Sequence, residues 1–358
     1  MRRLTNILVT GGAGFIGSNF IRYLFEKEGF SGTVVNADCL TYAGKEENLA
    51  DVEAQFGKTV VDSGATQRYF FEKADICNRD RMERIFRQYD IDTVIHFAAE
   101  SHVDRSICGP EAFIRTNVMG TQTLLDTARF YWLRKDGVLR DDVLFHQIST
   151  DEVYGSLGID GSFTEESPYE PRSPYAASKA AADHLVMAYH YTYGLPVTIS
   201  HCSNNYGPCQ FPEKFLPLVI SNIRDGKELP VYGDGRNIRD WIYVDDHIRA
   251  VWLIVNKGKT GGRYNISGEN EWRNIDLLHK VIELTAAECG LNPLDVEKTI
   301  RFVSDRPGHD RRYALDCSKL KDELGWKQTV NFEEGLRRTV SWYVGKDKYQ
   351  SVFSFSIR

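Results

Sequence analysis

The chain has 358 residues, and its 44 Lys and Arg against 50 Asp and Glu give a formal net charge of −6. This mildly acidic balance argues against a nucleic-acid partner, which would require a basic surplus or stripe. No apolar run approaches the roughly 18 residues of a membrane span, so no membrane partner is expected. Because Met1–Asn6 leads directly into an apolar strand pattern with no room for a signal peptide, we expect a cytoplasmic enzyme or binding protein.

The first two hundred residues alternate short apolar runs with helical patterns. Strands are predicted at Asn6–Thr10, Thr33–Ala37, Tyr69–Lys73, Thr93–Phe97, Val143–Ser149 and Val197–Cys202. Helices are predicted at Phe15–Lys27, Arg79–Gln88, Pro110–Leu133 and Pro174–Tyr193. This alternation indicates βαβ units in a Rossmann-type doubly wound parallel sheet covered on both faces. Because such sheets bind ligands beyond the carboxyl ends of their strands, the chemistry is expected in segments that follow strands.

After about residue 203 this alternation stops. Prolines and glycines predict a loop-rich region that includes Pro208, Pro212, Pro217, Gly226, Pro230, Gly233 and Gly235. Helical patterns return at Asp245–Asn256, Asn274–Ala287 and Phe332–Val344. Since the length predicts about two domains, we assign a larger domain to 1–203 and a smaller α/β substrate-binding domain to 204–350. Residues near 240–256 are expected to pack back on the first domain, and 351–358 to form a tail.

The seven cysteines form no C-x-x-C pair, and the nine histidines form no H-E-x-x-H motif. A disulfide framework, a zinc site and other metal sites are therefore not expected. Cys202 and Cys209 are expected to pack in the interior like small apolar residues.

A glycine-rich turn, Thr10–Gly17, follows the first strand and opens the first helix. Gly11, Gly14 and Gly17 permit a tight turn, close approach of a diphosphate and close packing of helix on strand. Asp38 ends the second strand about 20 residues later, where a carboxylate binds the ribose hydroxyls of a dinucleotide. Because that carboxylate would repel a 2′-phosphate, NAD is predicted rather than NADP. A purely structural turn is the alternative.

Further cofactor contacts are expected at the same edge of the sheet. Asp75 follows the third strand and can reach the adenine, although a surface aspartate is the alternative there. The remaining predicted contacts are Phe15, Ile16, Ile76, Ala98, Tyr175 and Lys179.

Tyr175 and Lys179 lie four residues apart near the start of a helix, so both side chains project from one face. A free tyrosine, with a pKa near 10, is a poor base at neutral pH. An adjacent ammonium ion and a positively charged nicotinamide would favour the phenolate and lower that pKa. Tyr175 could then take a proton from a sugar hydroxyl while the carbon is oxidised. The spacing alone occurs by chance on many helices, but after a dinucleotide turn it indicates catalysis.

Thr150, Asp151 and Glu152 stand at the end of the fifth predicted strand. Thr150 can hydrogen-bond the reacting oxygen. If the environments of the two carboxyl groups separate their pKa values, one serves as an acid and the other as a base. The removal of water from a sugar needs such a pair. A solvated acidic loop is the alternative.

These residues resemble the extended short-chain dehydrogenase/reductase superfamily, and within it the sugar-nucleotide dehydratases. The resemblance runs from about residue 5 to 345. It is carried by Thr10–Gly17, Ala37–Gly44, Ala98–Ser106, Ser149–Gly155, Tyr175–Lys179, Asn204–Pro208, Ile238–Trp241 and Asp305–Asp310. Sugar-nucleotide epimerases share the glycine turn and the Tyr-x-x-x-Lys pattern but generally lack the Asp-Glu pair. Lys45 departs from the pattern, which expects an uncharged polar residue in that loop.

The resemblance implies a hydro-lyase that acts on a nucleoside diphosphate hexose, with dTDP-glucose the expected substrate and rhamnose or deoxysugar biosynthesis the expected context. Tyr175, assisted by Thr150, would deprotonate the C4 hydroxyl as hydride passes to tightly bound NAD. Glu152 would then remove the C5 proton while Asp151 protonates the leaving C6 hydroxyl, and the hydride would return to C6. The order is chemically sensible because the C5 proton is weakly acidic until C4 is a ketone.

The resemblance also implies substrate contacts and an assembly. The expected substrate contacts are Ser101, Thr150, Asn205, Lys214, Arg239, Asn274, Arg306 and His309. A homodimer is expected, with Pro110–Leu133 and Pro174–Tyr193 pairing into a four-helix bundle. Two alternatives remain open: a related NAD-dependent UDP-sugar dehydratase, decarboxylase or epimerase, and a catalytically idle NAD-binding regulatory or scaffold protein.

Overall fold

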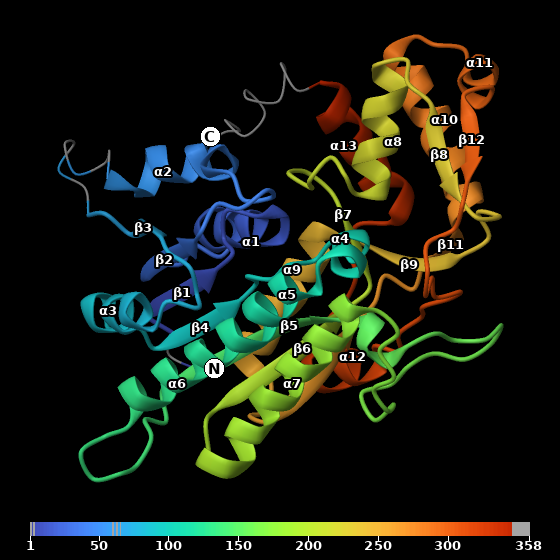
Figure 1. The fold of residues 1–358 in the computed structure, drawn as a ribbon. Helices are drawn as coiled ribbons and strands as arrows, with labels where there is room; N and C mark the ends of the chain where they lie inside the picture. The colour runs from blue at the N-terminus through green and yellow to red at the C-terminus, as the bar shows by residue number, and fades with distance from the viewer. Residues whose placement is uncertain (1, 3, 59–60, 62–63, 65, 346–358) are drawn as a thin grey trace.

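A computed structural model describes residues 2, 4–58, 61, 64 and 66–345. Its largest sheet has seven strands in the order β10-β6-β5-β4-β1-β2-β3, and all neighbouring pairs are parallel (Figure 1). The strands are β1 (Asn6–Thr10), β2 (Thr33–Asp38), β3 (Tyr69–Lys73), β4 (Thr93–His96), β5 (Leu144–Thr150), β6 (Val197–Cys202) and β10 (Gly262–Ile266). The strand order reverses between β1 and β4, which places the expected ligand crevice at their carboxyl ends.

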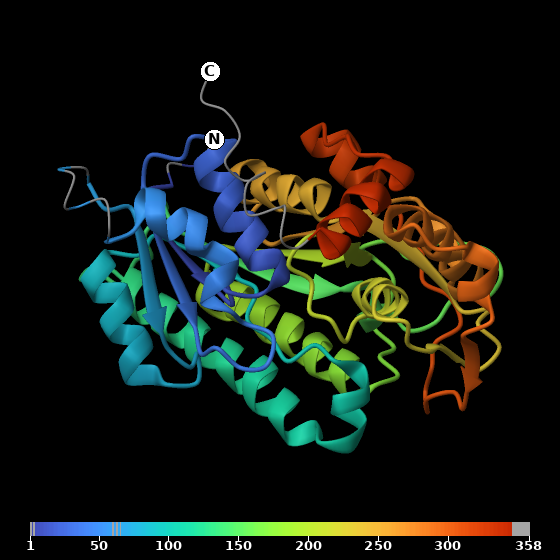
Figure 2. The same ribbon diagram turned by 90° about the horizontal axis from the view of Figure 1, so that it is seen from above.

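Helices cover both faces of this sheet, as the view from above shows (Figure 2). One face carries α1 (Phe15–Glu26), α2 (Ala50–Phe56), α9 (Val244–Lys257) and α12 (Ser318–Leu324); the other carries α3 (Arg79–Tyr89), α6 (Thr121–Trp132) and α7 (Pro174–Tyr193). Along β1, Ile7 and Val9 enter the first core and Leu8 the second. Successive side chains of a strand point to opposite faces, so continuous apolar strands require both helix layers.

The doubly wound α/β fold predicted from the sequence is confirmed, and each of the six predicted strands is present with ends shifted by at most one residue. The predicted helix over 110–133 is subdivided. It begins as α5 (Pro110–Phe113), continues as a π-helical segment (Ile114–Gly120) and ends as α6. Such π-helical turns are rare and occur often at functional sites.

A second lobe is built from the latter part of the chain and packs around its own core (Figure 1). Its strands are β7 (Asn204–Tyr206), β9 (Ile238–Tyr243) and β11 (Glu271–Arg273) in one sheet and β8 (Leu229–Tyr232) with β12 (Ile300–Val303) in another. Its helices are α8 (Phe215–Arg224), α10 (Asn274–Cys289), α11 (Pro293–Glu297) and α13 (Phe332–Val344).

The prediction of a loop-rich region after residue 203 was wrong for Phe215–Arg224, which is helical. Pro217, one of the prolines on which that prediction rests, lies in the first turn of α8. Backbone N–H groups in a first turn have no partner within the helix, so a proline loses nothing at that position.

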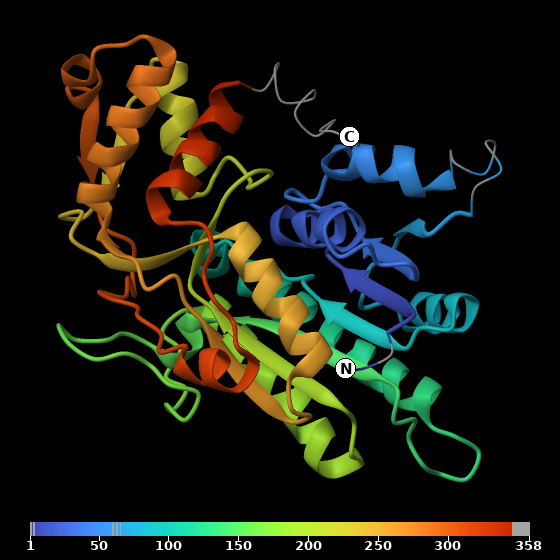
Figure 3. The same cartoon turned by 180° about the vertical axis from the view of Figure 1, so that it is seen from behind.

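The chain returns to the large sheet after forming part of the second lobe. Helix α9 packs on α1, and β10 pairs with β6 as the outermost strand (Figure 3). The division at residue 203 stays a prediction, and 351–358 lie outside the described residues. Within the described part of the chain, no helix is both long and apolar enough to cross a membrane.

Candidate active site

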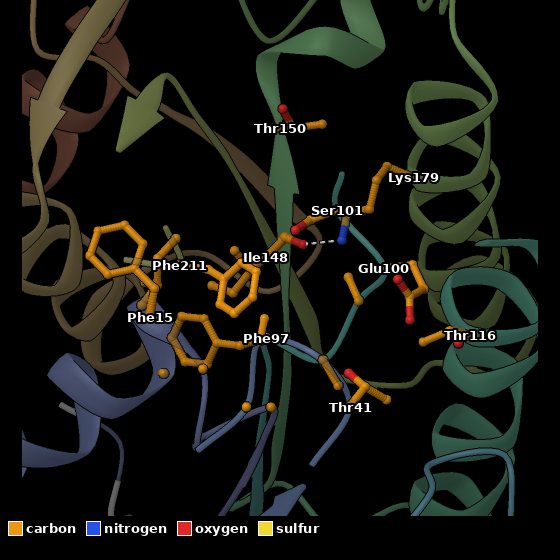
Figure 4. Close-up of a pocket in the computed structure, with 18 of the residues that line it drawn as sticks. Phe15, Thr41, Phe97, Glu100, Ser101, Thr116, Ile148, Thr150, Lys179 and Phe211 are labelled. Carbon is orange, nitrogen blue, oxygen red and sulfur yellow. Dashed lines mark hydrogen bonds between the residues drawn. The ribbon is translucent and has the colours of Figure 1, made fainter. Parts of the chain in front are cut away.

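A cavity of about 590 Å³ opens at the carboxyl ends of the central strands. Seventeen predicted site residues line it: Gly11, Gly14, Phe15, Ile16, Gly17, Asp38, Asp75, Ile76, Ala98, Ser101, Thr150, Asp151, Glu152, Tyr175, Lys179, Asn205 and Lys214. Figure 4 shows the rings of Phe15, Phe97 and Phe211 on one side of this cavity. Lys179 and Glu100 lie on the other side, so the cavity has one apolar and one polar wall.

The glycine turn has the geometry that a dinucleotide needs. Gly11 has a φ of +70°, and a Cβ there would lie 2.6 Å from the backbone N of Ala98. A Cβ on Gly17 would lie 2.5 Å from the carbonyl oxygen of Gly11, so helix and turn pack too closely for a side chain. Gly14 begins α1 with no side chain capping the helix, which leaves N–H groups of the first turn for a diphosphate.

Two carboxylates stand at the predicted adenosine end of the cavity. Asp38, at the end of β2, accepts from the backbone N of Ala13 at 3.0 Å and of Leu40 at 2.8 Å. Burial raises the pKa of Asp38, and these two N–H groups oppose the rise. Asp75 is half-buried and pairs with Arg115 at 2.7 Å. Hydrogen bonds from Cys77 and Arg115 hold the pKa of Asp75 below its usual value, although burial acts to raise that pKa. The turn and Asp38 together fit NAD.

Tyr175 and Lys179 point into the cavity from the first turns of α7, whose cap, Ser173, accepts from the backbone N of Ala176. Lys179 Nζ donates to the carbonyl of Ile148 at 2.6 Å, the bond drawn in Figure 4. Burial and the negative charge of Glu152 raise the pKa of Tyr175 well above 10, and a hydrogen bond with Thr150 opposes this rise. The expected net lowering of the pKa of Tyr175 is not seen, because burial is the largest influence on it.

The two carboxyl groups after β5 have different surroundings. Asp151 is 2% exposed and one of its oxygens, Oδ2, has no hydrogen-bond partner among the described residues. Burial and the neighbouring Glu152 raise the pKa of Asp151 well above its usual value. Burial also raises the pKa of Glu152, but Arg306, Arg239 and Lys214 oppose it. Asp151 is therefore suited to hold a proton and Glu152 to accept one.

The predicted substrate residues divide into two groups. Ser101, Asn205 and Lys214 line the cavity, and Lys214 Nζ donates to the carbonyl of Ser101 at 2.8 Å. The others stand outside the lining of this cavity among the described residues: Arg239, Asn274, Arg306 and His309.

Arg239 and Arg306 act on Glu152 through their charge from the second lobe. Arg239 is buried, donates to the carbonyl of Asp310 at 2.9 Å and lies 4.2 Å from the ring centre of Tyr313. Arg306 forms a 3.5 Å ion pair with Asp104. Both guanidinium groups therefore stand where the two lobes meet.

His309 and Asn274 are held by their own lobe. The ring of His309 contacts Asp305 at 2.6 Å, and the pKa of His309 is lowered by burial and by Arg306. Asn274 begins α10, and its backbone N donates to the carbonyl of Asn237 at 2.9 Å.

Sequence reasoning missed several polar residues of the cavity, Glu100 among them, and Asn117, which supports Glu100. Glu100 lines the cavity just after β4, where the rule on strand ends should have found it. Asn117, in the π-helical segment, exchanges bonds of 2.8 and 3.0 Å with the backbone of Glu100 and donates to Ser178 at 2.8 Å. No local pattern marks Asn117. Cys202, expected only to pack, is buried and also lines the cavity.

Three segments contact one another beside the cavity, and we call this contact the clasp; it consists of Tyr42, Arg105, Phe211 and Glu213. The rings of Tyr42 and Phe211 meet edge to face with centres 5.6 Å apart. The guanidinium carbon of Arg105 lies 3.9 Å from the ring centre of Tyr42, and Arg105 pairs with Glu213 at 2.8 Å. Lys45, the departure from the family pattern, adds an ammonium 5.9 Å from the ring of Phe211.

A doubly wound sheet with a dinucleotide turn at its switch point, and a Tyr-Lys pair beside two carboxyl groups, defines an enzyme of the extended short-chain dehydrogenase/reductase class. The sequence profile of the GDP-mannose 4,6 dehydratase family matches residues 8–339. The chain belongs to this family.

Relatives of known name share about half of its residues. The chain is 53% identical to a probable dTDP-glucose 4,6-dehydratase of Sinorhizobium fredii, over 94% of this chain and 92% of the relative. It is 51% identical to dTDP-glucose 4,6-dehydratase 1 of Escherichia coli, over 96% of this chain and 94% of the relative.

Solved structures of related enzymes have the same fold as this chain. DesIV of Streptomyces venezuelae, a dTDP-glucose 4,6-dehydratase with NAD and TYD bound, is 44% identical with a TM-score of 0.85, covering 97% of this chain and 98% of that one. A UDP-glucose 4-epimerase of Thermotoga maritima is 30% identical with a TM-score of 0.80, covering 96% of this chain and all (100%) of the epimerase. The fold alone therefore does not separate dehydration from epimerisation, whereas the sequence relatives do.

Proposed function

We propose that this protein dehydrates dTDP-glucose to dTDP-4-keto-6-deoxyglucose with NAD as a recycled cofactor. The observation that carries the proposal is the buried Asp151 beside Glu152, because this pair supplies the acid and the base that loss of water requires. The relatives with about 50% identity are dTDP-glucose 4,6-dehydratases, and related structures contain NAD. An idle scaffold would not need to retain Tyr175, Lys179 and both carboxyl groups.

In the proposed reaction, residues of the cavity carry out the proton transfers. NAD would be held by the glycine turn and Asp38, and when bound it supplies a reversible acceptor for the hydride taken from C4 and returned to C6. Tyr175 takes the proton of the C4 hydroxyl, and Thr150, bonded to Tyr175, orients the oxygen. The positive charges of Lys179 and of the nicotinamide favour the phenolate, against the effect of burial.

Elimination follows once C4 is a ketone, because the ketone acidifies the C5 proton. Glu152 removes that proton, and the positive charges of Arg306, Arg239 and Lys214 favour its ionised form beforehand. Asp151, whose pKa is raised by burial and by Glu152, gives its proton to the departing C6 hydroxyl. Reprotonation of C5 then completes the cycle.

The proposal is tested by incubating the purified protein with dTDP-glucose in deuterated water without added NAD. Loss of one water with deuterium at C5 is the expected result, and it would also show that the protein carries its cofactor. Unchanged dTDP-glucose after NAD is added, together with turnover of a UDP-sugar, would contradict the substrate assignment. If the NAD-bound protein turns over none of the sugar nucleotides, the scaffold alternative is favoured.

Assembly, compartment and metabolic context extend this proposal. A homodimer is supported by large apolar side chains exposed on the outer surface of α6, α7 and the π-helical segment, Ile114, Met119, Phe130 and Tyr191 among them. All seven cysteines lie within the described residues and no disulfide joins any two of them, which supports the cytoplasm. The keto sugar would serve rhamnose or other deoxysugar biosynthesis. Sedimentation at a single-subunit mass across concentrations would contradict the dimer.

We expect the clasp to slow the release of NAD. Arg105→Ala removes an exposed ion pair and a cation–π contact, together worth about 1 kcal/mol, so NAD should dissociate about fivefold faster. The rate is measured by dilution of the NAD-loaded protein and fluorescence detection. Arg338→Ala is the control: its side chain is 48% exposed like that of Arg105, pairs with Glu334 at 2.8 Å and faces Tyr243, but lies on α13. Equal rates of NAD release from both variants would contradict the expected role of the clasp in retaining NAD.

The pH dependence of turnover should respond to Arg306. Because its charge lowers the pKa of Glu152, Arg306→Met is expected to raise that pKa. The base would then be protonated at a higher pH, so the acid limb of the kcat profile should move upward by about half a unit or more. The measurement is kcat at saturating substrate between pH 4 and 8, about the range where carboxyl groups titrate when buried. An acid limb that stays in place would show that the charge of Arg306 does not control the pKa of Glu152.

A further inference from the structure

A buried polar cluster lies where α7 packs on β5 and β6, and the mechanism above does not use it. Its centre is Asp183, which is 1% exposed and lies one helical turn after Lys179 on the same face of α7. Asp183 Oδ2 accepts from Ser149 Oγ at 2.5 Å and from the hydroxyl of Tyr169 at 3.3 Å. The ring of His201 stands 3.2 Å from the same oxygen. Asp183 is not among the residues that line the cavity.

This cluster and Lys179 hold the same stretch of β5. Ser149, which donates to Asp183, stands between Ile148 and Thr150. The carbonyl of Ile148 accepts from Lys179 Nζ. One turn of α7 therefore fixes the backbone from which Thr150 and the two carboxyl groups follow.

The second consequence is electrostatic. Lys179 is 5% exposed, and burial lowers the pKa of its ammonium group while the charge of Asp183 raises it. The thiol of Cys202 on β6 supplies no such charge at neutral pH, because burial raises its pKa to about 12. His96 on β4 adds no repelling positive charge, because burial and Lys179 lower its pKa to about 3. Asp183 thus supplies the carboxylate that compensates the burial of Lys179.

The groups that face Asp183 from other elements are Ser149, Tyr169 and His201. His201 is fully buried, and its two ring nitrogens contact the hydroxyls of Tyr154 at 3.2 Å and Tyr169 at 2.6 Å. These contacts fix the ring of His201 against Asp183. The second carboxylate oxygen, Oδ1, is buried without a hydrogen-bond partner in the described part of the chain.

We propose that Asp183 is a positioning residue of the active site, which keeps Lys179 charged and holds the catalytic end of β5 against α7. Asp183 does this without touching substrate or cofactor. The inference rests on the predicted contact of Lys179 with NAD and on its proposed role in C4 oxidation.

The test is the pH dependence of NAD affinity in Asp183→Asn, measured by calorimetry. Asparagine keeps the shape but removes the charge, so Lys179 should lose its proton at lower pH. The decline of NAD affinity at alkaline pH is expected to begin about one pH unit lower than in the wild type. A second readout is the pH dependence of NAD reduction by substrate in the Glu152→Gln background, where elimination is blocked. Its alkaline limb should shift equally.

Two controls separate charge from structure. Ser149→Ala removes a hydrogen bond to Asp183 but leaves its charge, so the alkaline limb should stay in place. Asp246→Asn alters another fully buried carboxylate, which accepts from Thr329 and Val330 on the far side of the sheet, and should lower stability without moving the limb.

Three results would overturn the proposal. The alkaline limb of the pH profile could stay unmoved in Asp183→Asn, or be absent from both that variant and the wild type. It could also shift equally in Asp246→Asn. Failure of the wild type to bind NAD would overturn the cofactor assignment and this proposal together. The unmoved limb would overturn this proposal alone, so the two failures are distinguishable.

Discussion

Glu152→Gln is expected to abolish dehydration while the first oxidation continues. Glutamine matches the shape of Glu152 but cannot accept the C5 proton, so loss of water should fall about a thousandfold. Oxidation at C4 depends on Tyr175, so substrate should still reduce bound NAD, and reduced nicotinamide should accumulate. The two signals are followed together by near-ultraviolet absorbance and by mass spectrometry of the sugar.

Asp151→Asn is the matched variant, because it removes the acid and leaves the base. Dehydration should fall by a similar factor, but Glu152 can still take the C5 proton. In deuterated water, unreacted sugar should therefore gain deuterium at C5 in Asp151→Asn and gain none in Glu152→Gln. Exchange in both variants, or turnover of either at the wild-type rate, would show that the acid and base are assigned wrongly.

Tyr175→Phe is expected to stop the reaction one step earlier. Without the phenol, the C4 hydroxyl loses the group that we propose takes its proton, and substrate-dependent reduction of NAD should fall about a thousandfold. Single-turnover absorbance after mixing with dTDP-glucose measures this step. NAD content should be retained, since the glycine turn and Asp38 are unchanged.

Tyr69→Phe is the control for the loss of a buried phenol. Tyr69 is 3% exposed and bonds to Asn36 at 2.9 Å in β3, away from the cavity lining. It should reduce NAD at the wild-type rate. Undiminished NAD reduction in Tyr175→Phe would remove that residue from the mechanism.

The Rossmann-type half was predictable because its signals are local. The apolar runs, the glycines at 11, 14 and 17 and the Pro-Tyr start of α7 depend on residues within a few positions of one another. Strand β10 was missed because its place in the large sheet depends on pairing with β6, about sixty residues earlier. Helix α8 was missed because Pro217 was judged by residue type and not by its position in the turn.

The sequence by itself determined the fold class, because strand and helix patterns are local and their alternation can be followed along the chain. It also determined the dinucleotide turn and the five catalytic candidates, Thr150, Asp151, Glu152, Tyr175 and Lys179, because each depends on a short spacing along one strand or helix. Only the tertiary structure decided how those groups are charged. Arg239 and Arg306 come from the second lobe to oppose the burial of Glu152, while Asp151 has one oxygen without a partner. The physical reason is that a pKa depends on burial and on charges that the fold brings together from distant parts of the chain.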